Sequence, residues 1–168
     1  MANWPNSSNA SDGESKPRAL PNGLATNLLA NFPALPGVEI IKTYKTDDKC
    51  IGNEDQLNQV WINLLNNCLQ SMDYKGKIEI RIEKIDSWIV TSFIDSGAGI
   101  PIEIQDRIFD PFFTTKKHGE GIGLGLDICK TIITSMGGKI EFESVPGNTK
   151  FSVWLKSADA IEGDLHGN

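Results

Sequence analysis

The sequence predicts an α+β two-layer sandwich, in which a mixed and mostly antiparallel sheet is covered on one face by about three helices. Helical and strand patterns alternate along the chain, and two pairs of strand patterns are joined by turns of hairpin length. The chain has 168 residues, of which 39% are hydrophobic. That is enough for one domain with a real core.

The expected elements follow from apolar periodicity and from turn residues. Asn53 or Asp55 can cap the long second helix, and Gly137 and Gly138 end the last one. Pro101 fits the first turn of a short helix. Asp86 and Ser87 form one hairpin turn, and Pro146 and Gly147 another. The expected helices span residues 20–32, 56–72, 101–108 and 123–136, and the expected strands span residues 38–44, 77–85, 88–94, 139–144 and 149–155.

Composition divides the chain into three parts. Residues 1–19 are rich in Asn, Ser, Pro and Gly, so we expect a disordered segment or linker. Residues 20–156 carry the periodic patterns and form the predicted domain. Residues 157–168 are expected to be a polar C-terminal tail.

Charge and cysteine content exclude several classes of protein. The formal net charge is −6, which argues against a nucleic-acid binder. Three cysteines in neither a CxxC nor a zinc-like spacing argue against a disulfide framework or a metal cluster. No apolar run is long enough to cross a membrane, and the N-terminus has no signal pattern. We therefore expect a soluble, cytoplasmic chain whose membrane anchoring, if any, lies elsewhere in the full-length protein.

A glycine-rich stretch, Gly121 to Leu126, runs directly into the last long helix. Glycines let backbone N–H groups approach a phosphate, and the helix N-terminus adds unpaired donors and partial positive charge. The stretch comes too late in the chain for a dinucleotide fingerprint, and the chain lacks the Gly-Lys-Ser/Thr run of a P-loop. It points to a third kind of nucleotide site.

A narrow polar stripe, Asn63, Asn67 and Gln70, edges the apolar face of the long helix. One interpretation is a solvated polar edge. However, asparagine is a poor helix former, so the presence of several asparagines on this helix suggests that they have a functional role. An amide oxygen is also a suitable ligand for Mg²⁺, which usually binds phosphate and few protein groups.

Asp95 ends an apolar strand and is followed by Gly97 and Gly99. A carboxylate here can accept a hydrogen bond from the exocyclic amine of adenine, and the glycines let the chain pass close to a flat ring. The alternative is a simple Asx turn between a strand and a helix.

Together these segments resemble the catalytic ATP-binding domain of sensor histidine kinases, which belongs with gyrase and the heat-shock chaperone ATPases. The similarity covers about residues 20–156 and rests on four ordered motifs. Asn63 to Asn67 resembles the N box, Asp95 to Gly99 the first glycine box, Phe109 to Phe113 the F box, and Gly121 to Leu126 the second glycine box.

The resemblance implies ATP and Mg²⁺ as cofactors, with a mobile ATP lid over the site. Asn67 would hold the metal, Asn63 and Lys116 would be catalytic, and Asp95 would bind the adenine amine. Phe112 and Phe113 would anchor the lid, although both could be plain core aromatics. The implied nucleotide-binding set is Asn63, Asn67, Gln70, Asp95, Gly97, Gly99, Ile100, Phe112, Thr115, Lys116, Gly121, Gly123, Leu124, Gly125, Leu126 and Thr149.

Three positions depart from the family pattern. Cys68 stands where Ala is usual, and Gln70 occupies a position often held by a cation. A further motif of the family, the last box, falls at Pro146 to Phe151, and it lacks its usual second glycine. Either the box is one residue shorter, or Asn148 adopts the left-handed conformation that asparagine tolerates. Thr149, expected beneath the adenine, depends on which alternative holds.

The resemblance implies donation of the γ-phosphoryl group of ATP to a histidine on a separate dimerisation domain, with a response regulator downstream. ATPase relatives carry a Glu where this chain has Asn63, so slow or absent hydrolysis is expected. His118 and His166 are the only histidines, and neither lies on a helix beside an acidic residue. The alternatives are an ATP-binding pseudokinase, a serine kinase and an ATPase of the same superfamily. No contact of this segment with nucleic acid or membrane is expected.

Overall fold

The computed structural model describes residues 17–31, 35–113 and 125–160, and every structural statement below concerns these residues. Its helices are α1 (Pro21–Asn31), α2 (Glu54–Ser71), the 3-10 helix η1 (Ile102–Arg107) and α3 (Gly125–Ser135). Its strands are β1 (Arg18–Ala19), β2 (Val38–Tyr44), β3 (Cys50–Ile51), β4 (Gly76–Ile85), β5 (Trp88–Asp95), β6 (Lys139–Val145) and β7 (Asn148–Lys156).

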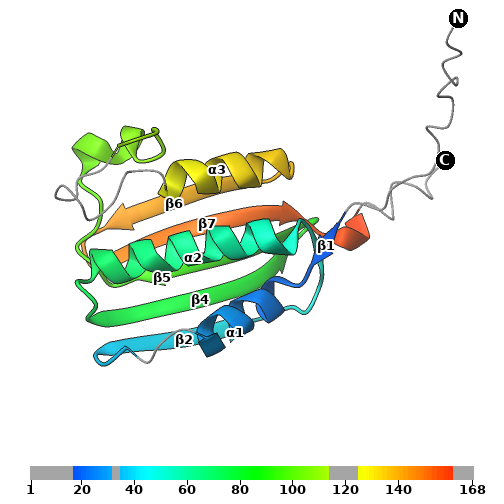
Figure 1. The fold of residues 1–168 in the computed structure, drawn as a ribbon, viewed down its shortest axis with the longest axis horizontal. Helices are drawn as coiled ribbons and strands as arrows, with labels where there is room; N and C mark the ends of the chain where they lie inside the picture. Colours follow the sequence, from blue (N-terminus) through cyan, green and yellow to red (C-terminus); the bar gives the residue numbers. More distant parts are fainter. Residues whose placement is uncertain (1–16, 32–34, 114–124, 161–168) are drawn as a thin grey trace, which may run out of the picture.

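Five strands form the main sheet in the order β2-β4-β5-β7-β6. Only β2 and β4 pair in parallel, and the other three pairings are antiparallel. Helices α1, α2 and α3 lie across one face of this sheet (Figure 1). The predicted α+β sandwich with a mixed, mostly antiparallel sheet is therefore confirmed.

The core lies between this sheet and the helices. Helix α2 is central: it packs against α1, α3 and β5. Its apolar stripe is buried against alternate residues of the sheet, since side chains of a strand alternate between its two faces. Trp61 contacts Phe93 of β5, with ring centroids 5.6 Å apart. The largest fully buried side chains are Trp61, Phe93, Leu57, Leu64, Leu65, Leu69, Ile78, Ile80, Ile82, Ile89, Ile133 and Leu155.

Asn53 is the N-cap of α2, one of the two residues that the sequence offered for this role. Its backbone is extended, and its side-chain Oδ1 accepts a hydrogen bond from the Gln56 amide at 3.1 Å. Glu54 and Asp55 lie in the first turn, where negative charge is favourable to the helix dipole. This cap fixes where α2 begins.

Replacing Asn53 with Ala is expected to lower the free energy of unfolding by about 1 kcal/mol, because one helix-terminal N–H loses its partner. Asn53→Asp keeps an acceptor at the same place and serves as the control, with little or no loss expected. Urea unfolding of the three proteins measures the effect. Equal losses in both variants would show that the cap does not depend on this acceptor.

A small two-stranded sheet, β1 with β3, lies outside the sequence prediction. Ala19 pairs with Cys50, and Cys50 also forms a bridge with Ser157. Arg18 and Ala19 belong to the segment expected to be disordered, and Ser157 belongs to the expected polar tail. Ala19 and Ser157 are nonetheless buried, because β3 holds a short segment on each side. Strands of two residues are too short for alternation to reveal them.

The other elements match their predicted ranges closely. The helix expected over residues 101–108 is a 3-10 helix, with Pro101 as its N-cap. The β4–β5 turn contains Asp86, which has φ +52°, a conformation that Asp tolerates better than most residues. Within the part of the chain that the structure describes, no helix is both long and apolar enough to span a membrane.

Candidate functional site

Asp95 lies at the end of β5 and faces the helices, and it is only 3% exposed. Its Oδ1 accepts two hydrogen bonds, one from the Ser71 hydroxyl at 2.7 Å and one from the Gly97 amide at 2.9 Å. Across the sheet it is level with Ile78 on β4 and Thr149 on β7. One oxygen of a nearly buried carboxylate is therefore held by the last residue of α2 and by the loop after β5.

Burial raises the pKa of the Asp95 carboxyl, while the bonds from Ser71, Gly97 and Cys68 act in the opposite direction. Burial also raises the pKa of the Cys68 thiol well above its usual value, and the neighbouring Asp95 carboxylate raises it further. Cys68 therefore stays a neutral thiol beside Asp95. The Asp95 carboxylate, as a hydrogen-bond acceptor shielded from water, is suited to a neutral amine donor.

The loop after β5 passes so close to its neighbours that a side chain is excluded at two of its positions, Gly97 and Gly99. A Cβ added to Gly97 would lie 2.7 Å from Asp95 Oδ1 and from the Ser71 carbonyl oxygen. One added to Gly99 would lie 2.9 Å from the backbone of Val145 and Pro146, and Gly99 also has φ +81°. Both glycines are thus required by space, which is stronger than the sequence argument from flexibility.

Two hydrogen bonds join this loop to the β6–β7 hairpin, and a third lies within the hairpin. The Gly147 amide donates to the Gly97 carbonyl at 2.8 Å, and the Ile100 amide donates to Ser144 Oγ at 2.8 Å. The hydroxyls of Ser144 and Thr149 lie 2.8 Å apart, and Thr149 is 2% exposed. The structure therefore links Gly97 and Thr149, which are next to Asp95, with Ile100 of the same loop through the hairpin.

The shortened last box has a simple explanation. Val145 pairs with Asn148, so Pro146 and Gly147 form a two-residue turn, with Gly147 at φ +84°. Asn148 lies in the β7 strand and has a negative φ. Of the two alternatives that the sequence left open, the shorter loop is correct and the left-handed Asn148 is wrong.

The polar stripe of α2 faces two ways. Asn63 accepts from Gln59 at 3.1 Å and donates to the Gly125 carbonyl at 3.2 Å, which ties α2 to the start of α3. The amide nitrogen of Asn67 is buried and has no hydrogen-bond partner among the described residues. Gln70 is exposed. The side chain of Asn63 therefore joins the two helices. The amide nitrogen of Asn67, in contrast, is a hydrogen-bond donor without an acceptor in the described structure.

The residues present fit the phosphates of a nucleotide. The unpaired atom of Asn67 is its amide nitrogen, a donor suited to a phosphate oxygen, because buried polar groups are nearly always satisfied by something. A Mg²⁺ ion would contact the amide oxygen of the same side chain instead. Among the described residues no group of three or more His, Cys, Asp or Glu could hold a metal ion. A Mg²⁺ ion at Asn67 would therefore take most of its ligands from phosphate and water, which is its usual habit.

The aromatic segment Phe109 to Phe113 contains two kinds of side chain. Phe113 packs against the core, with the Arg107 guanidinium 4.6 Å from its ring centroid. Phe109 also packs there, 6.0 Å from Phe142. Phe112 is 74% exposed and has φ +63°. As a core aromatic, Phe113 fits and Phe112 does not.

The second glycine box is only partly described. Gly125 begins α3, with open space where a Cβ would lie, and Leu126 packs against the core. The histidines His118 and His166 lie outside the described residues. So do five of the predicted nucleotide-binding residues: Thr115, Lys116, Gly121, Gly123 and Leu124.

Two residues that the sequence argument missed contact the site: Ser71 and Ser144. Ser71 follows Asn63 and Asn67 at i+8 and i+4, so the same helical period that revealed the stripe extends to it. Ser144 lies on the edge strand β6, where nothing in its sequence neighbourhood marks it. Its contact to Ile100 depends on a sheet pairing that only the fold supplies.

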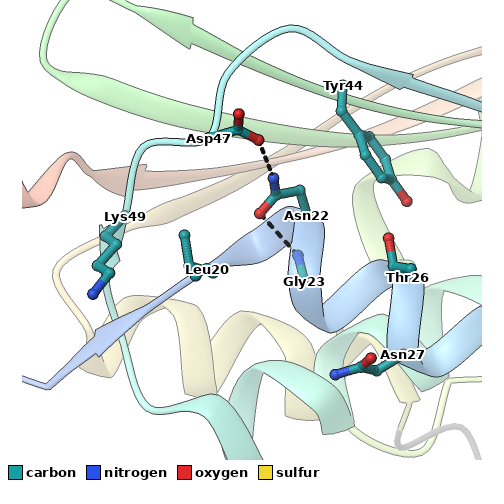
Figure 2. Close-up of a pocket in the computed structure, with 8 residues that line it drawn as sticks. All are labelled: Leu20, Asn22, Gly23, Thr26, Asn27, Tyr44, Asp47 and Lys49. Carbon is teal, nitrogen blue, oxygen red and sulfur yellow. Dashed lines mark hydrogen bonds between the residues drawn. The ribbon is translucent and has the colours of Figure 1, made fainter.

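A separate pocket of about 610 Å³ lies between the start of α1 and the end of β2 (Figure 2). Asn22 crosses it to donate to Asp47 at 2.6 Å. Tyr44 closes one side, with its hydroxyl buried beside Thr26. Tyr44 is level with Ile82 of β4, whereas Asp95 is level with Ile78, so this pocket is at the opposite end of the sheet.

Residues 52–159 match the family described as histidine kinase-, DNA gyrase B-, and HSP90-like ATPase. The chain is 41% identical over 112 residues to the C4-dicarboxylate transport sensor protein DctB of Rhizobium meliloti (strain 1021), covering 66% of this chain and 18% of DctB. It is 38% identical over 124 residues to sporulation kinase C of Bacillus subtilis (strain 168), covering 73% of this chain and 28% of that protein. The chain thus spans less than a third of these relatives.

Solved structures give the same result. The catalytic domain of histidine kinase ThkA superimposes with a TM-score of 0.75 at 30% identity, covering 83% of this chain and 94% of that domain. The family match spans most of the described chain. The chain therefore belongs to the family of histidine kinase-, DNA gyrase B- and HSP90-like ATPases, and it is the catalytic ATP-binding domain of the sensor histidine kinase type.

Proposed function

We propose that this domain binds Mg-ATP and donates the γ-phosphoryl group to a histidine on a separate dimerisation domain, as the catalytic part of a two-component sensor kinase. The observation that carries the proposal is the Asp95 carboxylate. It is buried at a strand end, its Oδ1 is held by Ser71 and Gly97, and the loop beside it has no room for a side chain at Gly97 or Gly99. This is an arrangement for reading one edge of a flat base.

In this proposal the base lies between the loop after β5 and the β6–β7 hairpin. Asp95 accepts from the exocyclic amine of adenine, and Gly97, Gly99 and Ile100 line the ring. Thr149 supports the pocket through its hydroxyl, which is paired with Ser144. A 6-oxo purine presents a carbonyl where adenine presents an amine, so the ionised carboxylate would repel it.

The phosphates extend from there toward Asn67 and the start of α3. Asn67 would hold Mg²⁺, which neutralises phosphate charge when bound. Asn63 orients the start of α3 through Gly125. The helix N-terminus there favours anions. Lys116 is proposed to contact the γ-phosphate, with Thr115, Gly121, Gly123 and Leu124 around the phosphates, and Gln70, Phe112, Gly125 and Leu126 complete the proposed set.

The proposed partners follow from the relatives. DctB is a sensor protein and sporulation kinase C is a kinase, and both are several times longer than this chain. The phosphoryl acceptor is proposed to be a histidine on the dimerisation domain of the full-length protein, and a response regulator is proposed to act downstream. A cytoplasmic location fits the supply of ATP that this reaction needs.

Alone with Mg-ATP, the chain is expected to hydrolyse ATP slowly or not at all and to stay unlabelled. Asn63 stands where ATPase relatives carry a general base, and an amide cannot take a proton at neutral pH. Incubation with γ-labelled ATP, followed by assay of released phosphate and of protein-bound label, measures both quantities. Rapid phosphate release would favour the ATPase alternative instead.

Addition of a histidine-bearing dimerisation domain in trans is expected to produce labelled acceptor that is acid-labile, as phosphohistidine is. A His→Ala acceptor is the matched control and should stay unlabelled. Acid-stable label on a serine would favour the serine-kinase alternative. Binding of ATP with no transfer to any acceptor would favour the pseudokinase.

A further inference from the structure

Ser71 is the last residue of α2, and it contacts the strand end through its side chain and the loop after it through its backbone. Its hydroxyl lies 2.7 Å from Asp95 Oδ1 and 2.9 Å from the Cys68 carbonyl oxygen. Its own carbonyl accepts from the Ala98 amide at 3.3 Å. A hydroxyl has a single proton, so the donation to Asp95 competes with a local bond within the helix.

The competition favours Asp95, because a bond to a carboxylate is stronger than one to a neutral carbonyl. The Gly97 amide donates to the same oxygen at 2.9 Å. Two donors from two different elements therefore converge on Oδ1. The two bonds restrain rotation of the carboxylate, so its orientation toward a bound base is set before any nucleotide arrives.

We propose that Ser71 is a positioning residue that makes the site selective for 6-amino purines, by holding Asp95 in one orientation and in its ionised form. The proposal rests on the nucleotide-binding function proposed above. Selectivity depends on ionisation because only the ionised carboxylate is purely an acceptor. A protonated carboxyl can also donate a hydrogen bond to the carbonyl of a 6-oxo purine, so it would no longer discriminate between 6-amino and 6-oxo purines.

The surroundings of Asp95 leave few other groups to control its ionisation. Cys68 faces it from α2 as a neutral thiol. Thr149 is level with it on β7, and Ser144 lies one strand further away on β6. Both carry neutral hydroxyls, which lie 2.8 Å from each other. Burial raises the pKa of Asp95, and the Ser71 hydroxyl is the largest of the effects that lower it again. Loss of this donor should therefore raise that pKa.

The test compares Ser71→Ala with Ser135→Ala. Ser135 is the last residue of α3 and donates to the carbonyl three residues before it, as Ser71 can. It contacts no carboxylate in the described structure, so it controls for the loss of a hydroxyl at a helix end. Calorimetric titration with ADP and with IDP, at fixed Mg²⁺ from pH 5 to pH 8, gives the affinities. Phosphate protonation affects all proteins alike and cancels in the comparison.

In the wild type and in Ser135→Ala, ADP binding should fall on acidification with the same midpoint. In Ser71→Ala that midpoint should move up by about one pH unit, equivalent to about tenfold weaker ADP binding on its acidic side. In the same pH range, the affinity of Ser71→Ala for IDP should rise relative to its affinity for ADP. An unchanged midpoint, or equal losses for ADP and IDP at every pH, would show that Ser71 is merely structural and would overturn the proposal.

A second measurement does not need a nucleotide. Carbon-13 NMR of the aspartate carboxyls follows the titration of Asp95, whose signal is identified by its loss in Asp95→Asn. Ser71→Ala should raise the pKa of Asp95, and Ser135→Ala should leave it unchanged. If the wild type bound neither nucleotide, the proposed function would fail along with the selectivity. The NMR titration would then still show whether Ser71 controls Asp95, and an unmoved signal would overturn that as well.

Discussion

Replacement of Asp95 by Asn is expected to weaken ADP binding by about tenfold or more, a loss of about 1.4 kcal/mol. The Asn Oδ1 can still accept from Ser71 and Gly97, so the pocket keeps its shape. The other carboxylate oxygen becomes an NH₂ group, which meets the adenine amine donor to donor. Calorimetric titration with ADP and a non-hydrolysable ATP analogue, with and without Mg²⁺, measures the loss.

The same substitution is expected to leave the nucleotide-free protein as stable as the wild type, or more stable. Burial raises the pKa of Asp95 above that of the unfolded chain. Stability linked to this group is therefore fully present below the unfolded pKa and is lost as the pH rises through the folded pKa. At pH 7 the ionised carboxylate is a cost, which Asn removes. Thermal unfolding at pH 7 should give an equal or higher Tm.

The exposed Asp106 provides the control, because Asp106→Asn removes the same charge from the surface of η1. It should change neither ADP binding nor Tm appreciably. ADP binding that is indifferent to Asp95→Asn would contradict the adenine pocket and favour the pseudokinase. Loss of ADP binding together with a much lower Tm in Asp95→Asn would mean that Asp95 stabilises the fold and does not bind the adenine directly.

Replacement of Gly99 by Ala is expected to cost about 3 kcal/mol of stability, from a left-handed backbone and from contact with fixed backbone atoms. Gly99 has φ +81°, and an added Cβ would lie 2.9 Å from the backbone of Val145 and Pro146. The hairpin must move away, which also breaks the bond from the Ile100 amide to Ser144. Urea unfolding measures the loss, and ADP binding should fall in the protein that remains folded.

Gly125 is the matched control, because the sequence assigns both glycines to the nucleotide site. An added Cβ at Gly125 meets nothing within 4 Å, and the residue begins α3. Gly125→Ala should leave stability unchanged or raise it by up to about 1 kcal/mol, since Ala is a better helix former. Similar losses at Gly99 and Gly125 would contradict the steric argument.

Local patterns in the sequence were sufficient for most of the architecture. Apolar periodicity predicts α2 and the strands β4, β5, β6 and β7, and the Asn53 cap follows from residue type alone. These features depend on interactions within a few residues, which a sequence displays directly. The order of the motifs then indicated the family and the importance of Asp95.

Features that depend on distant segments were not accessible in this way. The strands β1 and β3 exist only because they pair with each other, and a two-residue strand has no period to detect. Phe112 and Phe113 are identical neighbours, yet one is exposed and the other packs against the core. Their difference is set by the turn from Asp110 to Phe113, which contains both residues, and not by their chemistry.

The sequence by itself determined most of the elements and, through the order of its motifs, the family, because both depend on local residue patterns. Only the tertiary structure decided that Ser71 and Gly97 hold Asp95, and that Ser144 joins the loop to the hairpin. It also decided that Gly99 is required by space while Gly125 is not. The physical reason is that a hydrogen bond or a steric contact depends on distance in space, which sequence separation does not report.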